Sequence, residues 1–389
     1  MRRTWDVCAA VVSDLTFDAR VWKEARSLAD AGYRVCLIGC KYELPASHRR
    51  SEGPIQVVEI PLGTRQGRIS VVGRAVTLLR VWLAVIRTPA RAYHAHNIHV
   101  GPAAWLASRP RRAKLVYDAH ELYSEASGGL PLPQLTARIT RFVERFMVRR
   151  SDAVFTTNFS RVEHLRERYG RQSIEMLANV PLRVDDVVPL DPGYPSGAPI
   201  ILYQGGIYAR ARAFRETLEA LATLTDVHFV IIGFGRDHDI QLVRRWADEC
   251  GVAGRVHLLP PRPFDELVRT AAGASVGLVP IKATGTNHRL GDTNKLFEYL
   301  MAGLPVAASD LPEIRRVVTQ GDPPVGELFN PNSPLSIADA IQRVLTDTAY
   351  DRRRQEARRL ALERFNWEIE ERRLIGVYQT VFANGATGG

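Results

Sequence analysis

Lys295 and Glu298 are the residues whose types and spacing first suggest chemistry. They lie three apart in TNKLFEYLMAGLPVAASD, residues 293–310. This stretch predicts a polar turn, a helix ended by Gly303 and Pro305, and a short apolar strand. Helical spacing places the two residues one turn apart near a helix amino terminus, where free N–H groups favour phosphate. One cation for a phosphate and one carboxylate for a hydroxyl pair would suit a nucleoside diphosphate. The alternative is a capped surface helix with an ordinary ion pair.

His120 is the second candidate for chemistry. The segment LVYDAHELY, residues 115–123, predicts an apolar strand that ends at Asp118 and gives way to polar residues. In a parallel sheet, His120 then lies at the carboxyl edge, where such folds bind ligands. Asp118 before it and Glu121 after it favour a functional histidine over a structural one.

Two series of strands and helices would position these residues. The first begins with a strand at 7–12, a helix closed by Gly32 and a strand at 35–38; the second begins with a strand at 200–204. Such βαβ units build parallel sheets. A proline- and glycine-rich stretch at 183–198 without periodicity separates them and predicts a linker. The length of 389 residues also favours two domains.

The charge is unevenly distributed along the chain. Residues 1–182 carry 28 basic and 16 acidic side chains, whereas the whole chain has a net charge of +10. A basic first half predicts an acidic partner, for which a phosphorylated acceptor or an anionic membrane surface would serve. Nucleic acid is not expected, since the sequence has no RNA-binding signature, zinc finger or convincing helix-turn-helix. A cytoplasmic protein is expected for three reasons. The four cysteines form no CxxC pairs, the sequence shows no signal segment, and it has no apolar run of about 18 residues.

Two amphipathic segments carry much of this basic charge. We expect both to pack on the sheet with their arginines outward. Their expected faces are Val76, Leu79, Leu83 and Ile86 in residues 73–88, and Ile139, Phe142, Val143 and Phe146 in residues 138–150. A role at a membrane surface would instead require an exposed apolar face with a basic rim.

Several motifs resemble the GT-B glycosyltransferases of family four. TNKLFEYLMAGLPVAASD resembles the donor-site signature of that family, and YDAHELYSE resembles its strand-end motif. DARVWKEARSLADAGYRV is similar to its first βα unit, and YQGGIYARAR to the loop with its pyrophosphate-binding arginine. The resemblance extends from Asp18 to Tyr378.

The resemblance implies an α/β GT-B fold. Two Rossmann-like domains would face a central cleft, with a C-terminal helix that crosses back to the N-terminal domain. The expected divisions are an acceptor-binding domain at 1–182, a linker at 183–198, a nucleotide-sugar-binding domain at 199–365 and the terminal helix at 366–384.

The resemblance also implies a retaining, metal-independent enzyme. It would move a sugar from a UDP- or GDP-linked donor to a small-molecule, lipid-linked or polysaccharide acceptor, with no further cofactor. The catalytic residues would be His120, Arg212, Lys295 and Glu298. The donor-binding residues would be Gly205, Gly206, Arg210, Arg212, Gly233, Phe234, Asn294, Lys295, Leu296 and Glu298. The acceptor-binding residues would be Asp18, Arg20, His96, Asn97, Asp118 and Glu121. Arg212 matches the pyrophosphate-binding arginine of the family best, but a one-residue insertion leaves Arg210 as an alternative match.

Two patterns bear on metal binding. His94, His96 and His99 lie in one strand-to-loop segment, but no carboxylate or cysteine stands close enough in the sequence to complete a ligand set. The stretch 237–239 spells DxD, which holds a metal in another transferase architecture. Here it follows a glycine turn and opens a helix, where acidic residues are favoured, so we expect no metal ion.

Alternatives to this function remain open. The family places a glutamate eight residues before Glu298, and that position is Leu290 here. Its loss favours a non-catalytic nucleotide-sugar-binding protein, and the same fold also suits a nucleotide-sugar epimerase. Peripheral contact with the inner face of the membrane is open as well, and the sequence does not predict an oligomeric state.

Overall fold

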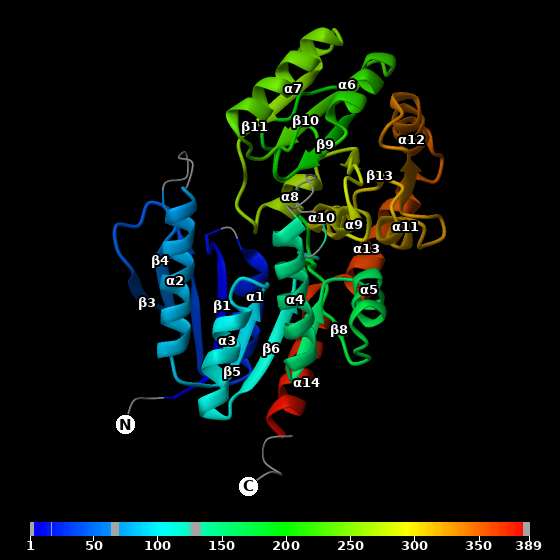
Figure 1. Cartoon of the computed structure of the whole chain (residues 1–389). Helices are drawn as coiled ribbons and strands as arrows, with labels where there is room; N and C mark the ends of the chain where they lie inside the picture. Colours follow the sequence, from blue (N-terminus) through cyan, green and yellow to red (C-terminus); the bar gives the residue numbers. More distant parts are fainter. Residues whose placement is uncertain (1–3, 17, 64–69, 124, 126–133, 384–389) are drawn as a thin grey trace. The chain divides into compact units, whose positions relative to one another are not determined.

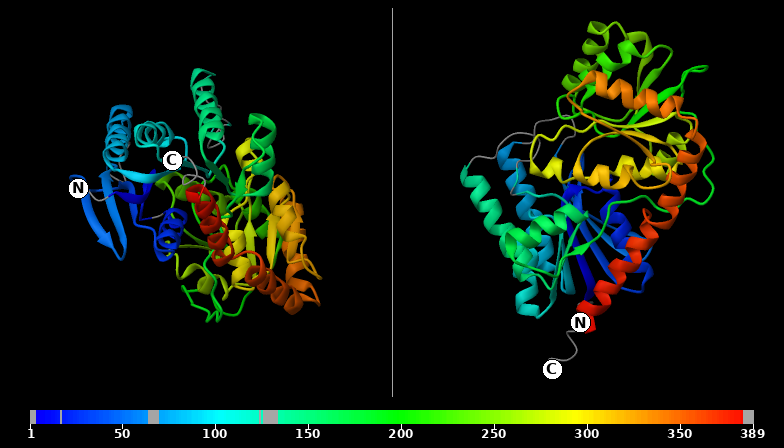
Figure 2. Two further views of the ribbon diagram at one scale, coloured as in Figure 1. Left: turned by 90° about the horizontal axis from the view of Figure 1, so that it is seen from below. Right: turned by 90° about the vertical axis from the view of Figure 1, so that its right-hand side faces the viewer.

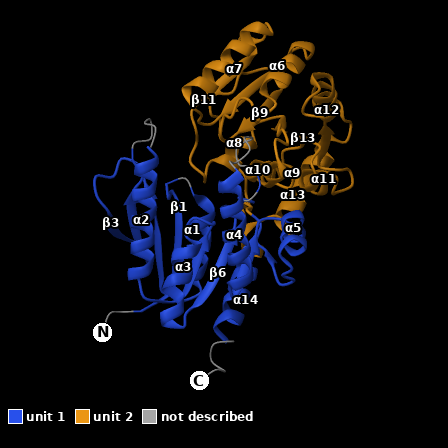
Figure 3. Ribbon diagram, in the orientation of Figure 1, with its two compact units in different colours: residues 1–125, 131–178, 370–389 blue, residues 126–130, 179–369 orange. Residues whose placement is uncertain are grey.

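The chain forms two compact units, each with its own sheet. The structure is a computed structural model that describes residues 4–16, 18–63, 70–123, 125 and 134–383 (Figure 1). Unit 1 comprises residues 1–125, 131–178 and 370–389, and unit 2 comprises residues 126–130 and 179–369 (Figure 3).

Unit 1 is built on an eight-stranded sheet. Its strand order is β3-β4-β2-β1-β5-β6-β7-β8, and the described pairs are parallel except β3 with β4. The strands are β1 (Trp5–Asp14), β2 (Val35–Lys41), β3 (His48–Glu52), β4 (Ile55–Pro61), β5 (Ala90–His96), β6 (Lys114–Ala119), β7 (Ala153–Thr156) and β8 (Glu175–Met176). The helices are α1 (Ala19–Asp30), α2 (Val71–Arg87), α3 (Gly101–Ser108), α4 (Gln134–Arg150), α5 (Phe159–Tyr169) and α14 (Trp367–Ala383).

Helices cover both faces of this sheet. α2, α3 and α4 lie on one face, and α1 and α14 lie on the other (Figure 2, left view). The central strand β1 is apolar and fully buried from Val7 to Val11, because both faces of the sheet are covered. The strand order reverses between β1 and β5, and open α/β sheets bind ligands at the carboxyl ends of strands beside such a reversal.

Unit 2 has a six-stranded sheet in which the described pairs are all parallel. Its order is β11-β10-β9-β12-β13-β14. The strands are β9 (Ile200–Gln204), β10 (His228–Ile232), β11 (Val256–Leu259), β12 (Val276–Val279), β13 (Val306–Ser309) and β14 (Gly326–Phe329). The helices are α6 (Phe214–Thr223), α7 (Asp237–Glu249), α8 (Leu267–Ala271), α9 (Thr286–Arg289), α10 (Asn294–Met301), α11 (Pro312–Val318), α12 (Pro334–Thr346) and α13 (Tyr350–Glu363). The order reverses between β9 and β12, so the turn after β9 lies at the ligand-binding edge.

The expected parallel α/β organisation is confirmed, but residues 183–198 differ from a free linker. They belong to unit 2, where the N–H of Leu190 donates to Arg269 O at 2.9 Å and the hydroxyl of Tyr194 donates to Thr270 O at 2.8 Å. The chain passes between units earlier, at residues 178–179, and returns at 369–370 within α14.

The inward faces expected for α2 and α4 are wrong. α2 buries Thr77, Val81 and Val85, and α4 buries Glu144, Met147 and Val148. The expected residues Val76, Leu79, Leu83, Ile139 and Phe142 are exposed, while Ile86, Val143 and Phe146 are half-buried. Each helix has apolar residues outside the side that packs on the sheet, so periodicity alone does not single out that side. No helix among the described residues is long and apolar enough to cross a bilayer.

Candidate active site

The residues expected to do chemistry in unit 1 meet at the carboxyl ends of β5 and β6. The parallel register pairs His96 with Asp118. The next residue after β5, Asn97, has a left-handed backbone with φ of 70°, and its N–H donates to Asp118 O at 2.9 Å. Its side-chain Oδ1 accepts the backbone N–H of His120 at 3.2 Å. Asn97 therefore joins the two strand ends and fixes the backbone that carries His120.

His120 is held in one tautomer by its partners. Its Nε2 lies 2.8 Å from Asp118 Oδ2, and its Nδ1 lies 3.4 Å from Asn97 Nδ2. An ionised carboxylate only accepts hydrogen bonds, so Nε2 carries the proton and Nδ1 is left as the acceptor. The His120 side chain is 14% exposed, whereas those of His96 and Asp118 are buried. Among these three, His120 is the side chain that a ligand can reach.

Arg20 supports Asp118 from below the surface. Its Nε and Nη2 donate to the Asp118 carboxylate at 2.9 to 3.0 Å, and its Nη1 donates to Leu177 O at 2.7 Å. Burial alone would raise the pKa of Asp118, but Arg20 and the neighbouring histidines hold that pKa well below its usual value. Asp118 is thus ionised, and the guanidinium of Arg20, which is 3% exposed, is engaged inside the protein rather than presented to an acceptor.

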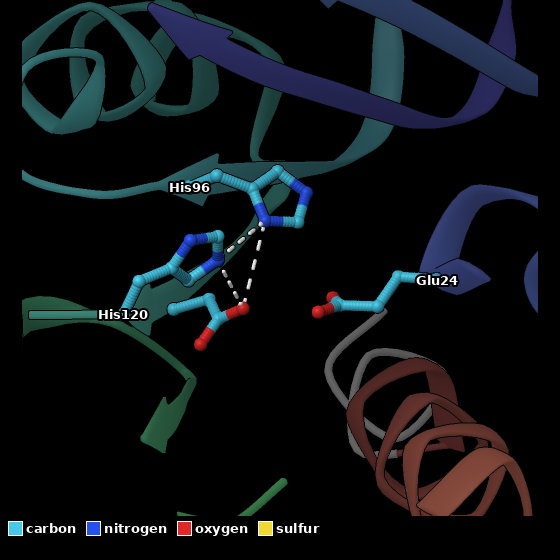
Figure 4. A group of neighbouring side chains, drawn as sticks. Glu24, His96 and His120 are labelled. Carbon is cyan, nitrogen blue, oxygen red and sulfur yellow. Dashed lines mark hydrogen bonds and ion pairs between the residues drawn. The ribbon is translucent and has the colours of Figure 1, made fainter. Parts of the chain in front are cut away.

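Glu24 completes a cluster that sequence reasoning missed. One ligand atom each from Glu24, His96, Asp118 and His120 lie within 4.8 Å of one another (Figure 4). The expectation that no carboxylate stands near His96 is therefore wrong, because α1 and β6 bring two. Arg20 Nε lies 2.9 Å from Glu24 Oε1 as well as bonding to Asp118. Its guanidinium supplies the positive charge that a metal ion would otherwise bring, so the residues present fit an arginine-centred cluster better than a cation site. The i, i+4 spacing of Arg20 and Glu24 was the available signal.

His94 belongs to the core beneath this cluster. Its ring stacks on His96 at a centroid distance of 4.2 Å, and its Nδ1 lies 2.9 Å from the hydroxyl of Tyr378 on α14. Burial lowers the pKa of His94 well below its usual value, with a further contribution from His96. This histidine is therefore neutral and structural, and it ties α14 to β5.

The remaining expected residues of unit 1 differ in exposure. Asp18 caps α1 through Val21 N at 3.4 Å and accepts the hydroxyl of Ser13 at 2.5 Å. Glu121 is exposed in the loop after β6. Arg161, which the sequence did not single out, is buried and donates to the carbonyl oxygen of His120. The feature of the sequence that could have indicated Arg161 is its position in the first turn of a helix that follows the end of a strand.

Lys295 is the centre of the expected site in unit 2. α10 is anchored to β9 by the hydroxyl of Tyr299, which accepts Gln204 N at 2.9 Å and donates to Leu202 O at 3.0 Å. Lys295 lies one turn earlier and is 6% exposed. Its Nζ donates to Thr293 Oγ1 at 3.1 Å and lies 4.9 Å from the centre of the Tyr203 ring.

Glycines make room around this lysine. Gly205 has φ of 129°, and a Cβ there would lie 3.4 Å from Lys295 Nζ. A Cβ on Gly233 would lie 1.9 Å from Gly205 O, so the turns after β9 and β10 touch at a distance that no side chain permits. Gly206 follows in the same turn, and Phe234 after Gly233 is 45% exposed. The N–H of Gly205 donates to Ile232 O at 2.9 Å, so the two glycine turns pack closely against each other beside Lys295.

Two cations share this site. The pKa of Lys295 is lowered to about 7, first by burial and then by the charge of Arg212, while Glu298 opposes the shift. Arg212 is half-buried, and its Nε is buried with no acceptor among the described residues. Arg210 is exposed, so the structure favours Arg212 as the arginine that acts with Lys295. An anion between them would relieve both the repulsion and the unmet hydrogen bond.

The amino end of α10 adds further donors. Thr293 makes no side-chain capping bond, because its hydroxyl accepts the Lys295 ammonium instead. Asn294 is exposed there, and Glu298 is half-buried one turn further on. Leu296 differs from the expectation: its side chain is fully buried and its N–H donates to Thr293 O at 3.0 Å, so it has nothing to offer a ligand.

The DxD stretch opens α7, as expected for helix-start residues. Asp237 is the first residue of the helix and is exposed. Asp239 Oδ1 accepts the N–H of Ala209 at 3.1 Å, which links α7 to the loop before Arg212. Leu290, in the position of the family's first acid, caps the carboxyl end of α9.

Two Rossmann-like units with candidate residues at the carboxyl edges of their sheets define a two-domain, doubly wound α/β class of protein. Residues 18–179 match the family described as "Glycosyl transferase 4-like domain", and residues 198–347 match "Glycosyl transferases group 1". Together the two matches cover most of the chain. The chain therefore belongs to the GT-B glycosyltransferases of family four, and it is an enzyme.

Curated relatives and solved structures agree with this family. The chain is 28% identical to a D-inositol 3-phosphate glycosyltransferase of Xylanimonas cellulosilytica, over 73% of this chain and 70% of that protein. It is 29% identical to a phosphatidyl-myo-inositol mannosyltransferase of Mycobacterium tuberculosis, over half of each. Sucrose-phosphate synthase from Thermosynechococcus elongatus has the same fold, with a TM-score of 0.78 and 19% identity over 98% of this chain and all of that one. A structure of Anabaena HepE in complex with UDP-glucose matches with a TM-score of 0.69 and 14% identity, over 97% of this chain and all of that one.

Proposed function

We propose that this glycosyltransferase takes its sugar from a nucleoside-diphosphate donor, UDP- or GDP-linked, and retains the anomeric configuration. The observation that carries the proposal is the Lys295–Arg212 pair beside two glycine turns. A buried lysine next to an arginine is unfavourable in the empty protein and becomes favourable when a pyrophosphate occupies the site. The same two charges would stabilise the negative charge that develops on the leaving nucleoside diphosphate.

Glu298 and the glycine turns would hold the rest of the donor. A carboxylate one turn after Lys295 suits the hydroxyl pair of a ribose, because an ionised acceptor makes the stronger hydrogen bonds. Gly205, Gly206 and Gly233 carry no side chains and would let the phosphates approach the backbone closely, with Asn294 at the helix terminus.

His120 would line the reacting sugar in this proposal. Asp118 keeps the imidazole proton on Nε2, and Nδ1 would accept a hydroxyl of the sugar in place of the side-chain N–H of Asn97. Asn97, which bonds to the same nitrogen, and the exposed Glu121 would contact the acceptor. Arg20 and His96 would act through Asp118 and orient His120.

The acceptor that this chain fits best carries a phosphate. Two observations support this: the names of the two curated relatives above specify an inositol phosphate and a phosphatidylinositol, and the first half of this chain is basic. An acceptor of this kind could be a free polyol phosphate or a lipid-linked one.

The competing functions predict different products. We would incubate the protein with a panel of UDP- and GDP-sugars, with and without inositol 3-phosphate, and follow released nucleoside diphosphate and sugar products by NMR. Free nucleoside diphosphate with an α-linked product from an α-linked donor would support the proposal. A product isomer formed without acceptor would indicate an epimerase, and tight binding without turnover a non-catalytic protein.

Metal independence belongs to the same proposal. The Arg20 guanidinium bonds to the carboxylate of Asp118 and lies against that of Glu24, and Asp237 and Asp239 serve as helix-start residues. We expect the chemistry to proceed without a divalent cation.

A further inference from the structure

Unit 1 exposes a large amount of apolar surface on two helices. On α4, Leu135 and Phe142 are each 70% exposed and Ile139 is 55% exposed. On α2, Val71 is 85% exposed and Leu79 is 57% exposed. Single exposed apolar side chains are ordinary, but a gathering of them on one side of a unit marks an interaction site.

These side chains belong to one face of unit 1. α2 and α4 flank α3 on the same side of the sheet (Figure 2, left view). α2 follows β4 and α4 precedes β7, so in a parallel sheet both helices begin at the carboxyl edge, the edge that carries His120. We call the exposed surface of α2 and α4 the helical face.

The helical face is strongly basic. Its two helices contain eight arginines and a single acidic residue, Glu144, which is buried and accepts the hydroxyl of Tyr169. Arg138, Arg141 and Arg145 are exposed and, within the described part of the chain, make no hydrogen bond or ion pair. They alternate along α4 with the exposed Ile139 and Phe142, so apolar and cationic groups share one surface.

We propose that the helical face docks on an anionic lipid bilayer. The apolar side chains would enter the boundary between headgroups and acyl chains, and the arginines would bind the lipid phosphates. A second copy of the chain fits less well, since a two-fold contact would bring the same unpaired arginines against each other. Nucleic acid fits less well too, because the exposed phenylalanine and aliphatic side chains would stay in water. The proposal does not depend on the donor or acceptor of the enzyme.

Vesicle sedimentation tests the proposal directly. The full chain is mixed with vesicles of phosphatidylcholine alone and with vesicles containing about one third phosphatidylglycerol, at low salt and at high salt. We expect binding to the anionic vesicles and little to the neutral ones, with the charge-dependent part reduced at high salt because screening shortens to about 3 Å at 1 M.

Two matched pairs of variants separate this surface from general effects. Arg141→Gln with Arg145→Gln removes two charges of the helical face, and Arg244→Gln with Arg245→Gln removes two exposed charges on α7 of unit 2. A contribution of about fivefold per arginine near an anionic surface predicts roughly 25-fold weaker partition for the first pair and no change for the second.

The apolar contribution is tested in the same way. Leu135→Ser with Phe142→Ser changes α4, and Leu335→Ser with Phe264→Ser changes exposed residues of unit 2. Loss of two buried apolar groups predicts at least about tenfold weaker partition for the α4 pair only. All four substituted residues are exposed, so unchanged thermal unfolding is the check that each variant is folded.

Three results would overturn the proposal. The first is a parent protein that does not bind anionic vesicles. The second is an α4 variant that binds these vesicles as strongly as the matched unit 2 control variant. The third is a dimer in solution that the α4 substitutions convert to a monomer, which would assign the helical face to a second copy. Lys295→Met should bind vesicles like the parent, so a failure of the nucleotide site and a failure of membrane docking give separate results.

Discussion

Replacing Lys295 by methionine should raise stability and weaken nucleotide binding at once. Burial and Arg212 lower the pKa of this lysine to about 7, from a usual value of 10.5. Because the pKa of this lysine is lower in the folded protein than in the unfolded chain, its protonation lowers the free energy of unfolding. This loss is complete below about pH 7 and disappears as the pH approaches 10.5. The shift corresponds to an upper limit of about 5 kcal/mol at neutral pH. Relief of even 2 kcal/mol would raise the Tm of a unit of this size by about 4 to 8 °C.

The effect on ligand binding has the opposite sign. Loss of one charge-assisted contact to pyrophosphate costs about 1.5 to 3 kcal/mol, so the Kd for UDP or GDP should rise about tenfold to a hundredfold. A bound diphosphate also raises the pKa of Lys295, so binding by the parent should take up a proton near pH 8. Calorimetry in buffers of different ionisation heat measures that uptake, and Lys295→Met should lack it.

Lys282→Met is the matched control. Its Nζ lies 2.5 Å from Glu216 Oε1 and is partly exposed, so its removal breaks an ion pair in the same unit without relieving a buried charge. We expect no gain in stability and no change in nucleotide affinity. A Lys295→Met protein that melts lower than its parent and binds UDP and GDP with unchanged Kd would refute the assignment of this lysine to a diphosphate.

Other perturbations give equally definite results. Arg212→Ala should weaken nucleoside-diphosphate binding, and its combination with Lys295→Met should depart from additivity by more than about 0.5 kcal/mol in a calorimetric cycle, since both meet one ligand; strict additivity would place them at separate sites. Glu298→Gln should weaken nucleotide-sugar binding in the same assay, because a neutral acceptor is the weaker one; an unchanged Kd would remove the ribose role. Turnover should survive excess EDTA, and loss restored by manganese would count against the metal-free mechanism. Arg20→Met should lower the free energy of unfolding by about 3 to 5 kcal/mol in urea, because it leaves the charge of Asp118 buried and unpaired; a variant as stable as the parent would show that Arg20 is not a buried support.

Sequence patterns predicted the order of elements well. The strands that lead to His120 and to Gly205 are mainly apolar runs ended by a polar residue or a glycine, and this signal is local in the sequence. The stop of α10 at Gly303, which has φ of 68°, is of the same kind. Asp118 and His120 were found because they stand at such a strand end, and Lys295 because it stands at the start of the helix that Gly303 stops.

Contacts between elements that are distant in the chain could not be predicted from the sequence. The placement of Glu24 and Arg20 beneath Asp118 depends on how α1 packs against the sheet, and no periodicity reports that packing. Leu296 stands beside Lys295 in the motif, yet one step of about 100° around the helix turns its side chain into the core. For α2 and α4 the apolar residues were read correctly, but which of them contact the sheet depends on neighbours that only the fold supplies.

The chain leaves unit 1 after Ala178 and returns to it at Glu370, and these two residues lie next to each other. Ala178 donates its N–H to Glu370 Oε2 at 2.9 Å. Residues 179–369, the larger segment of unit 2, are thus one continuous insertion into unit 1 whose two ends are joined by a hydrogen bond. Insertions of this kind can be excised. A short loop from Ala178 to Glu370 should close unit 1 as an independent protein, with its sheet and histidine cluster intact.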